Sequence, residues 1–154
     1  RSTTTFGENV SEAQGDLWGT QLDLFYTLDN RFGPFDFDPC TVANNPLGVR
    51  NFCYLPVRDG LVTIWEGRVF MNPPYSKPRP WLERAIEMVK GGSVTSVLGL
   101  IKCDPSTKWW NDCIKNEPLA KLIYPWPKRI KYRGATQVAN FPSAIILWTR
   151  LEEP

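Results

Sequence analysis

The spacing of apolar residues along the chain predicts two amphipathic helices and a third, shorter one. The first holds Leu24, Phe25 and Leu28 at helical spacing, with Thr20 placed to act as its N-cap. The second opens at Arg79-Pro80 and is stopped by Gly91-Gly92, which are typical helix boundaries. Its apolar face holds Trp81, Leu82, Ala85, Ile86 and Val89. A short third helix is expected after the loop at 104–110, ending near Asn116.

Apolar runs between and after these helices predict the strands of one sheet. Short strands are expected at 35–40, 52–55 and 68–71. Residues 94–101 are rich in Val, Leu and Ile without strict alternation, which is typical of a central parallel strand buried on both faces. The last third predicts strands at 122–124, 129–132 and 143–148, with no room for helices between them. The sheet should therefore be mostly parallel and finish with an antiparallel C-terminal hairpin.

This order of elements indicates an α/β protein with a three-layer architecture. We expect a single domain over residues 16–154, because the chain has about one domain's length and shows no internal repeat. Residues 1–15 are rich in Ser, Thr, Gly and Gln and are expected to be flexible. No apolar stretch is longer than a strand, so no membrane partner is expected. The pattern does not indicate an oligomeric state.

The composition restricts the chemistry that the chain can perform. It contains no histidine, and its four cysteines, at 40, 53, 103 and 113, form no Cys-x-x-Cys pair. This argues against zinc sites of the usual kind and against a His-dependent triad, so no metal is expected. Scattered cysteines indicate reduced thiols and a cytoplasmic protein. Any catalysis must then rely on carboxylates, amides, backbone groups or a cofactor.

The most specific motif is Asn72-Pro73-Pro74-Tyr75, directly after the strand at 68–71. Two prolines cannot continue the ladder, so the strand must end in a rigid corner at its carboxyl edge, where open α/β sheets bind ligands. There the Asn72 side-chain oxygen and the Pro73 carbonyl can act as two acceptors for an amino group such as that of adenine. The motif is typical of amino-methyltransferases. Its alternative, a polyproline ligand, fits poorly after an apolar strand.

Aromatic residues near this corner are candidates for holding a planar substrate. Tyr75 offers an aromatic ring beside the two acceptors, against which a planar group carrying an amino nitrogen can stack. Alternatively, it is a core aromatic that covers the start of the following helix. Of Trp109 and Trp110, at least one is expected to pack inward, and the other could line the pocket or contact DNA.

Taken together, the motifs resemble the phage-type DNA N-6-adenine methyltransferases, a compact Dam-like family, over roughly residues 16–150. The resemblance depends on the order of the following segments along the chain: Trp18-Gly-Thr20-x-x-x-Leu24-Phe25, Phe35-x-Phe37-Asp38-Pro39-Cys40, Gly60-Leu61 with Trp65, Val69-Phe70-x-Asn72-Pro73-Pro74-Tyr75-Ser76, Trp109-Trp110, Arg129-Ile130 and Phe141-Pro142-Ser143. It implies a Rossmann-like fold that uses S-adenosylmethionine to methylate adenine in double-stranded DNA inside the host bacterium of a phage or prophage.

The resemblance also implies residues for the cofactor. These are Trp18, Thr20, Asp36, Asp38, Pro39, Cys40 and Asn72. A carboxylate at a strand edge suits the ammonium group of the methionine moiety, although Asp38 also reads as a turn residue before Pro39. The chain departs from the family where Gln21 replaces a proline, and it lacks the Gly-rich loop that generic methyltransferases carry after this strand. The implied catalytic residues are Asn72, Pro73, Pro74 and Tyr75.

The net charge is only +2, so the chain as a whole does not indicate a polyanionic partner. The candidate DNA surface is instead a local cluster of basic residues. Lys128, Arg129, Lys131 and Arg133 fall within six residues and stand beside aromatic residues, as expected of a surface that contacts phosphates. Lys77 and Arg79 are further candidates. The alternative is a strand edge protected by charges.

Three other functions remain possible on the sequence alone. Protein-glutamine and RNA adenosine methyltransferases use the same tetrapeptide, but usually with a Gly-rich loop and a separate substrate domain. A catalytically silent nucleic-acid-binding module of this fold is the third, and the intact tetrapeptide argues against it.

Overall fold

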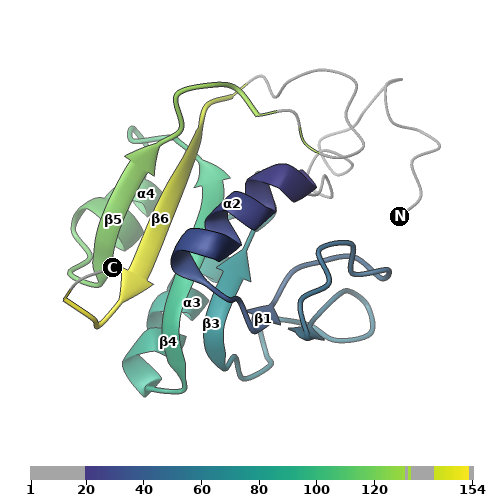
Figure 1. Ribbon diagram of the computed structural model, residues 1–154. Helices are drawn as coiled ribbons and strands as arrows, with labels where there is room; N and C mark the ends of the chain where they lie inside the picture. Colours follow the sequence, from purple (N-terminus) through teal and green to yellow (C-terminus); the bar gives the residue numbers. More distant parts are fainter. Residues whose placement is uncertain (1–19, 131, 133–140, 153–154) are drawn as a thin grey trace.

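A six-stranded sheet forms the centre of the computed structural model, which describes residues 20–130, 132 and 141–152. The strand order is β2-β1-β3-β4-β6-β5. The strands are β1 (Phe37–Asp38), β2 (Asn51–Phe52), β3 (Gly67–Met71), β4 (Val94–Lys102), β5 (Ala120–Pro125) and β6 (Ser143–Thr149). Helix α2 covers one face of the sheet and α3 and α4 cover the other (Figure 1). The expected three-layer α/β architecture is therefore confirmed.

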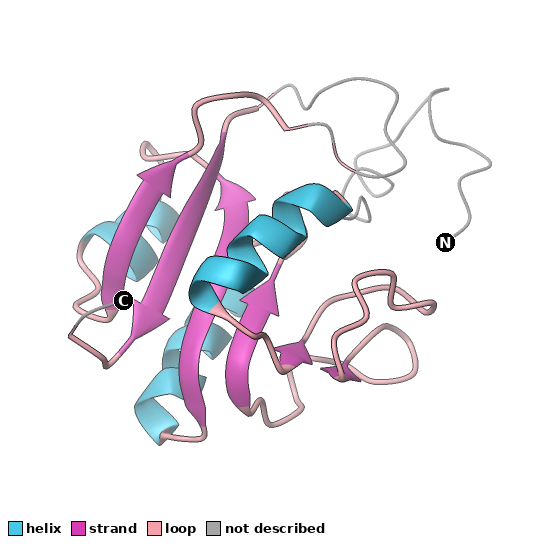
Figure 2. Ribbon diagram, in the orientation of Figure 1, coloured by secondary structure: helices cyan, strands magenta, loops and turns pink. Residues whose placement is uncertain are grey.

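The strand directions confirm a mostly parallel sheet with an antiparallel pair at its C-terminal end. β1 pairs in parallel with β2 and β3, and β3 pairs in parallel with β4. β6 is antiparallel to both of its neighbours, β4 and β5. The hairpin prediction was incomplete, because β6 lies between β4 and β5 rather than at the edge of the sheet. Figure 2 shows β6 between its two antiparallel neighbours.

The predicted strand at 129–132 was wrong for the residues that the structure describes there. Arg129, Ile130 and Tyr132 lie outside any strand, and Lys131 lies outside the described residues. The alternating pattern has another cause: Ile130 and Tyr132 are buried against the α2 face of the sheet. The Tyr132 hydroxyl also lies 2.8 Å from the Ser143 hydroxyl, within hydrogen-bond distance. Ile130 and Tyr132 thus attach this part of the chain to the α2 side of the sheet.

Two apolar clusters fill the spaces on either side of the sheet. Successive residues of a strand point to opposite faces, so Phe70 joins the α2 side while Val69 and Met71 join the α3 side. The same alternation divides β4 and β6 between the two clusters. Both faces of the central strands are therefore covered, which explains why 94–101 shows no polar alternation.

The helices follow the predicted apolar stripes. α2 (Leu22–Phe32) buries Phe25 and Leu28, and α3 (Arg79–Gly91) buries the predicted face and ends at Gly92, whose φ is 90°. α4 (Lys108–Trp110) continues into the π-helical turn η1 (Asn111–Lys115), which ends next to Asn116 as expected. The helix begins earlier than predicted, at Lys108, because the Thr107 hydroxyl caps it. The cap prediction was wrong: Gln21 is the N-cap of α2, and Thr20 accepts a hydrogen bond from Asn72 instead.

Gly60 lets the loop after β2 pass directly over the end of β1. A Cβ atom added there would collide with the Pro39 carbonyl oxygen and lie 2.9 Å from the Trp81 ring. The loop is held in this place because the buried Trp65 indole donates a hydrogen bond of 2.7 Å to the Gly60 carbonyl. This close approach brings the loop against the residues that follow β1.

We expect Gly60→Ala to lower the free energy of unfolding by about 1–3 kcal/mol, the usual cost of overpacking. The melting temperature should fall by several degrees, since about 1 kcal/mol corresponds to about 2–4 °C in a domain of this size. Gly91→Ala is the matched control, because nothing lies within 4 Å of a Cβ added there. Equal melting temperatures for the two variants would contradict the close packing at Gly60.

Candidate functional site

A pocket of about 250 Å³ opens where the chain changes direction across the sheet. From β1 the chain first moves to β2 on one side and then to β3 on the other, so the switch point lies between β1 and β3. Ligands bind in open α/β sheets at the carboxyl ends of the strands beside such a point. The pocket is lined there by Asp38, Pro39 and Cys40 after β1, and by Asn72 and Pro74 after β3. We call it the Asp38 pocket.

Asp38 contributes a buried carboxyl group to this pocket. Its side chain is 3% exposed, and burial raises its pKa from 3.8 to about 7. One partner lowers that pKa in part: the backbone N–H of Cys40 donates a hydrogen bond of 3.1 Å to Oδ1. Among the described residues no lysine or arginine forms an ion pair with Asp38. A buried carboxyl without a cation is a suitable binding group for a ligand ammonium.

Asn72 has its side-chain oxygen directed away from any partner in the described protein. The amide nitrogen donates a hydrogen bond of 3.1 Å to the Thr20 hydroxyl, which fixes the side chain. The amide oxygen Oδ1 is buried and accepts no hydrogen bond from the described residues. Leaving a buried acceptor unpaired costs about 1–3 kcal/mol. Such an atom indicates a site whose missing donor is supplied by a ligand.

The rest of the tetrapeptide lies between this pocket and an aromatic cluster. Pro73 is buried, Pro74 lines the Asp38 pocket, and Tyr75 is half-buried. The Tyr75 ring centroid lies 4.8 Å from that of Phe141 and 5.4 Å from that of Tyr132. Burial raises the pKa of Tyr132, while hydrogen bonds with Ser143 and Tyr75 act in the opposite direction. Tyr75 is therefore partly a packing residue, as its alternative interpretation expected.

Of the described residues expected at the cofactor, Asp36 is not brought to the pocket. Asp36 is exposed at the other end of β1, where its carboxylate accepts a hydrogen bond of 2.9 Å from the Arg68 backbone N–H. It stabilises the start of β3 and is not retained as a candidate. Trp18 lies outside the described residues. The structure brings Thr20, Asp38, Pro39, Cys40 and Asn72 together in the lining of the pocket.

Several residues that line the pocket gave no functional signal in the sequence. Tyr54, Leu55 and Arg58 come from the segment 41–60, which lacks periodicity because most of it is loop. Trp81 lines the pocket from the first turn of α3, although its place on the apolar stripe indicated only a core residue. The Gly60-Leu61 motif with Trp65 was the one available signal that this segment returns to the site.

The predicted basic residues differ in how free their side chains are. Lys128 and Arg129 are exposed on the connection that leaves β5 at the edge where β3 and β4 also end (Figure 1). Lys131 and Arg133 lie outside the described residues. Lys77 is exposed directly after the tetrapeptide.

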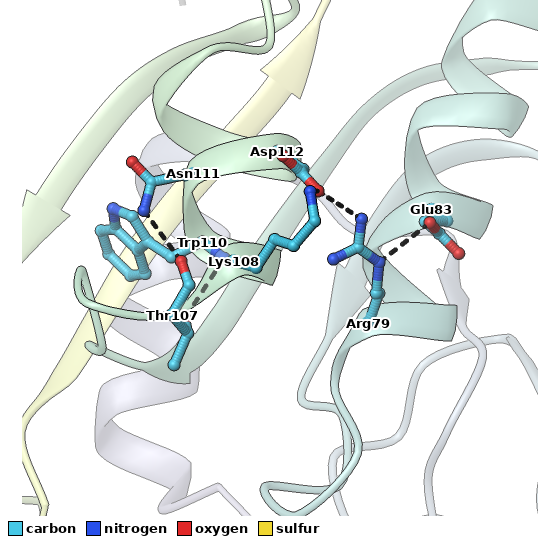
Figure 3. A network of polar contacts seen from close by, with 7 residues as sticks. All are labelled: Arg79, Glu83, Thr107, Lys108, Trp110, Asn111 and Asp112. Atoms are coloured by element: carbon cyan, nitrogen blue, oxygen red, sulfur yellow. Dashed lines mark hydrogen bonds and ion pairs between the residues drawn. The ribbon is translucent and has the colours of Figure 1, made fainter.

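Arg79 is engaged in ion pairs rather than free to contact DNA. Its guanidinium lies 3.2 Å from Glu83 and 2.5 Å from Asp112, which also pairs with Lys108 at 3.0 Å (Figure 3). The hydrogen bond from Arg79 is the largest cause that lowers the pKa of Asp112. This network joins the first turn of α3 to η1, so Arg79 has a structural role.

Metal-ligating clusters and membrane-spanning helices are not features of the described residues. Within residues 20–130, 132 and 141–152, no three His, Cys, Asp or Glu side chains gather into a group that could hold a metal ion. Of the helices in the same part of the chain, none is both long and apolar enough to cross a membrane.

Comparisons with known proteins agree with the motif order. The family model described as DNA N-6-adenine-methyltransferase (Dam) matches residues 7–154. The sequence is similar to the DNA N-6-adenine-methyltransferase of Haemophilus phage HP1 (strain HP1c1), with 35% identity over 147 residues, 91% of this chain and 82% of the phage protein. A protein of the same name from Escherichia phage T1 is 27% identical over 121 residues, 77% of this chain and 48% of that protein.

Among solved structures, a candidate RNA methyltransferase from Pyrococcus horikoshii is similar with a TM-score of 0.48 and 14% identity. The match covers 70% of this chain and 54% of that protein. The chain thus spans about half of this structure and of the phage T1 relative, and about four fifths of the phage HP1 relative.

Proposed function

We propose that this chain, which belongs to the family of DNA N-6-adenine-methyltransferases (Dam), methylates the 6-amino group of adenine in duplex DNA at Asn72 and Pro73. The observation that carries the proposal is the buried, unpartnered Oδ1 of Asn72 on the wall of the Asp38 pocket. An acceptor without a donor at that place matches the need of an exocyclic amino group, which brings two N–H donors.

The residues of the Asp38 pocket fit S-adenosylmethionine. When bound, this cofactor supplies an electrophilic methyl group on its sulfonium sulfur. Asp38 would bind the ammonium of the methionine moiety, since it is buried and has no cation beside it in the described protein. Pro39, Cys40 and Tyr54 offer apolar surface around the remainder of the pocket.

In this reaction the main role of the protein is to position the adenine. Its amino nitrogen is a poor nucleophile because the lone pair is delocalised into the ring. Asn72 Oδ1 and the Pro73 carbonyl would accept hydrogen bonds from both amino hydrogens and draw the nitrogen toward tetrahedral geometry. Preorganised acceptors of this kind act electrostatically and need no covalent intermediate with the protein. The absence of histidine from the whole sequence is compatible with this mechanism.

The substrate must leave the base stack to reach these acceptors, because its amino group lies inside the duplex. Lys128 and Arg129 lie exposed at the same edge of the sheet as the tetrapeptide and would bind DNA phosphates. We expect the enzyme to act in the cytoplasm of a bacterial host, since both phage relatives come from viruses of bacteria.

Methyl transfer with a tritiated methyl donor tests the proposal directly. The protein is offered duplex DNA, RNA and a protein mixture in separate reactions, and the labelled product is hydrolysed and identified. Label recovered as N6-methyladenine from DNA is the expected result. Label in RNA or protein alone would overturn the assignment of the substrate, and cofactor binding without transfer would indicate the silent module.

The basic connection should affect DNA binding more than chemistry. We expect Lys128→Gln with Arg129→Gln to weaken binding to every duplex alike, because phosphate contacts carry no sequence information. The slope of log affinity against log salt should flatten by about 0.9 for each phosphate that the variant no longer neutralises. Methyl transfer at saturating DNA should change much less. The measurement is a filter-binding or anisotropy titration at several salt concentrations.

A control that removes the same amount of charge is Lys90→Gln with Lys121→Gln. Both lysines are exposed, and they lie at the opposite edge of the sheet, near the end of α3 and the start of β5. An equal change of slope in the two double variants would mean that net charge alone acts, and that Lys128 and Arg129 only protect the sheet edge.

A further inference from the structure

A second cavity, of about 480 Å³, lies on the other side of the tetrapeptide from the Asp38 pocket. One wall is the segment 75–80, which begins with Tyr75. The other is formed by Lys102 at the end of β4, Asp104 in the loop that follows and Trp109 in α4. Pro74 lines the first pocket and Tyr75 lines this one, so the two cavities are separated by a single peptide link. We call it the Trp109 cavity. Its volume lies within the range of about 300–1,000 Å³ that is usual for small-molecule sites.

The walls of the Trp109 cavity are held in place by an ion pair of the lining residue Arg79 and by the cap of α4. Arg79 joins the first turn of α3 to Asp112 of η1, so the two walls cannot separate without breaking that ion pair (Figure 3). On the other wall, the Thr107 hydroxyl accepts a hydrogen bond from the Trp110 backbone N–H and caps α4. Trp110 is buried at 5% exposure, while its neighbour Trp109 is only half-buried and faces the cavity. Trp110 is therefore the fully buried member of the pair, while Trp109 packs against the same core cluster and also lines the cavity.

The chemistry of the lining suits a group that is both planar and anionic. Trp109 offers an indole ring, and Lys77 is exposed at the mouth without an ion-pair partner among the described residues. Lys102 lies 3.7 Å from Asp104 and 5.9 Å from the Phe141 ring, so it is only partly neutralised. The N-terminal end of α3 adds a positive partial charge at the same place. A nucleotide combines a flat base with a phosphate.

We propose that the Trp109 cavity binds the nucleotide next to the target adenine, with its base against Trp109 and its phosphate at Lys77. The inference rests on the proposed function and adds a second interaction with the same DNA strand. Turning one nucleotide out of the duplex costs unstacking energy, and stacking of its neighbour on an aromatic ring would offset part of that cost. Every base can stack on an aromatic ring, so this interaction would bind the neighbouring nucleotide without recognising its sequence.

A double-mutant cycle, in which one change is made in the protein and the other in the DNA, tests this interaction through the measured DNA affinity. After the methylated site has been mapped in genomic DNA, duplexes are made with an abasic residue on either side of the adenine. For one of these neighbours, the wild-type protein should lose roughly 5- to 150-fold in DNA affinity, the range for one stacked base. Trp109→Ala should lose a similar factor on intact DNA, and no further affinity on that abasic duplex, because both changes remove the same interaction.

Three controls keep the test decisive. Trp109→Phe should restore most of the affinity, since it retains a ring, and cofactor affinity should stay unchanged in both variants. Tyr26→Ala removes an aromatic side chain that is 59% exposed on α2. Any loss of DNA affinity that it causes should add to the loss caused by the abasic residue, because the two changes remove separate interactions. Lys77→Gln should flatten the salt slope by about 0.9 yet keep the full loss on the abasic duplex.

The outcomes separate this inference from the proposed function. If the protein does not methylate DNA, the proposed function fails before the cycle begins. A second outcome is that DNA is methylated, but the affinity losses caused by Trp109→Ala and by each abasic neighbour add independently. That outcome refutes only the role of Trp109. A third duplex carries the abasic residue at the adenine position itself. Coupling of Trp109→Ala with this duplex alone would also overturn the inference, because Trp109 would then hold the extruded base.

Discussion

Asn72→Ala is expected to lower methyl transfer at least about a hundredfold, the loss seen when one preorganised polar contact to a transition state is removed. The alanine variant has no oxygen to accept a hydrogen bond from the adenine amino group. Its stability should change little, because the variant loses one hydrogen bond to Thr20 and also loses a buried oxygen that had no partner in the described protein. Single-turnover transfer and thermal melting measure the two effects separately.

Two further variants make this result interpretable. Asn72→Asp keeps a side-chain acceptor and should retain more activity than the alanine variant. Asn111→Ala removes hydrogen bonds of 2.8 and 3.1 Å to the carbonyls of Thr107 and Pro105, away from the Asp38 pocket. It should lower the melting temperature while methyl transfer persists. Activity of Asn72→Ala within a few-fold of wild type would remove Asn72 from the mechanism.

Asp38→Asn should stabilise the free protein at neutral pH and weaken its binding of the cofactor. The folded pKa of Asp38 is about 7, above the unfolded value of 3.8, so folding favours the protonated carboxyl. The wild-type protein therefore loses stability as the pH rises between these values, whereas the asparagine variant does not. One pKa unit is about 1.4 kcal/mol, so the advantage of the variant approaches about 4 kcal/mol above pH 7. Thermal melting at pH 5 and pH 8 should reveal the growing gap.

The wild-type protein should bind the cofactor more strongly than Asp38→Asn, although it is the less stable of the two. The wild-type protein binds an ammonium better once Asp38 is ionised, so its affinity for S-adenosylhomocysteine should rise roughly tenfold from pH 5.5 to 7. Asp38→Asn should bind more weakly and show a flat profile in the same calorimetric titrations. If the two proteins share one affinity and one pH profile, Asp38 only shapes the turn through its hydrogen bond to Cys40.

The parts of the fold that could be predicted from the sequence are those whose signal is local. The apolar run ending at the two prolines after Asn72 predicted a strand end, and the structure has β3 ending at Met71. The misleading segment at 129–132 has the alternation of a strand, but its apolar residues are drawn into a cluster formed by distant elements. Sequence alone cannot separate those two causes of the same pattern.

The residues of the candidate site also include some that the sequence could predict and some that it could not. Asp36 and Asp38 look equivalent in the sequence, yet they lie at opposite ends of a two-residue strand, and only Asp38 reaches the pocket. Their difference depends on where β1 pairs with β3, which is a long-range property. The lining residues from 41–60 were missed because a loop wall has no periodicity, and its position follows from the close packing at Gly60.

The position of β6 has a consequence for how the chain folds during synthesis. β5 pairs only with β6 in the described sheet, and β6 is the last strand to be made. Until the ribosome has released residues 143–149, β4 presents an unpaired edge and β5 has no neighbour to join. Unpaired strand edges favour association with other chains. At about 5–20 residues per second this exposure lasts seconds on each nascent chain, so truncation before β6 should yield insoluble protein.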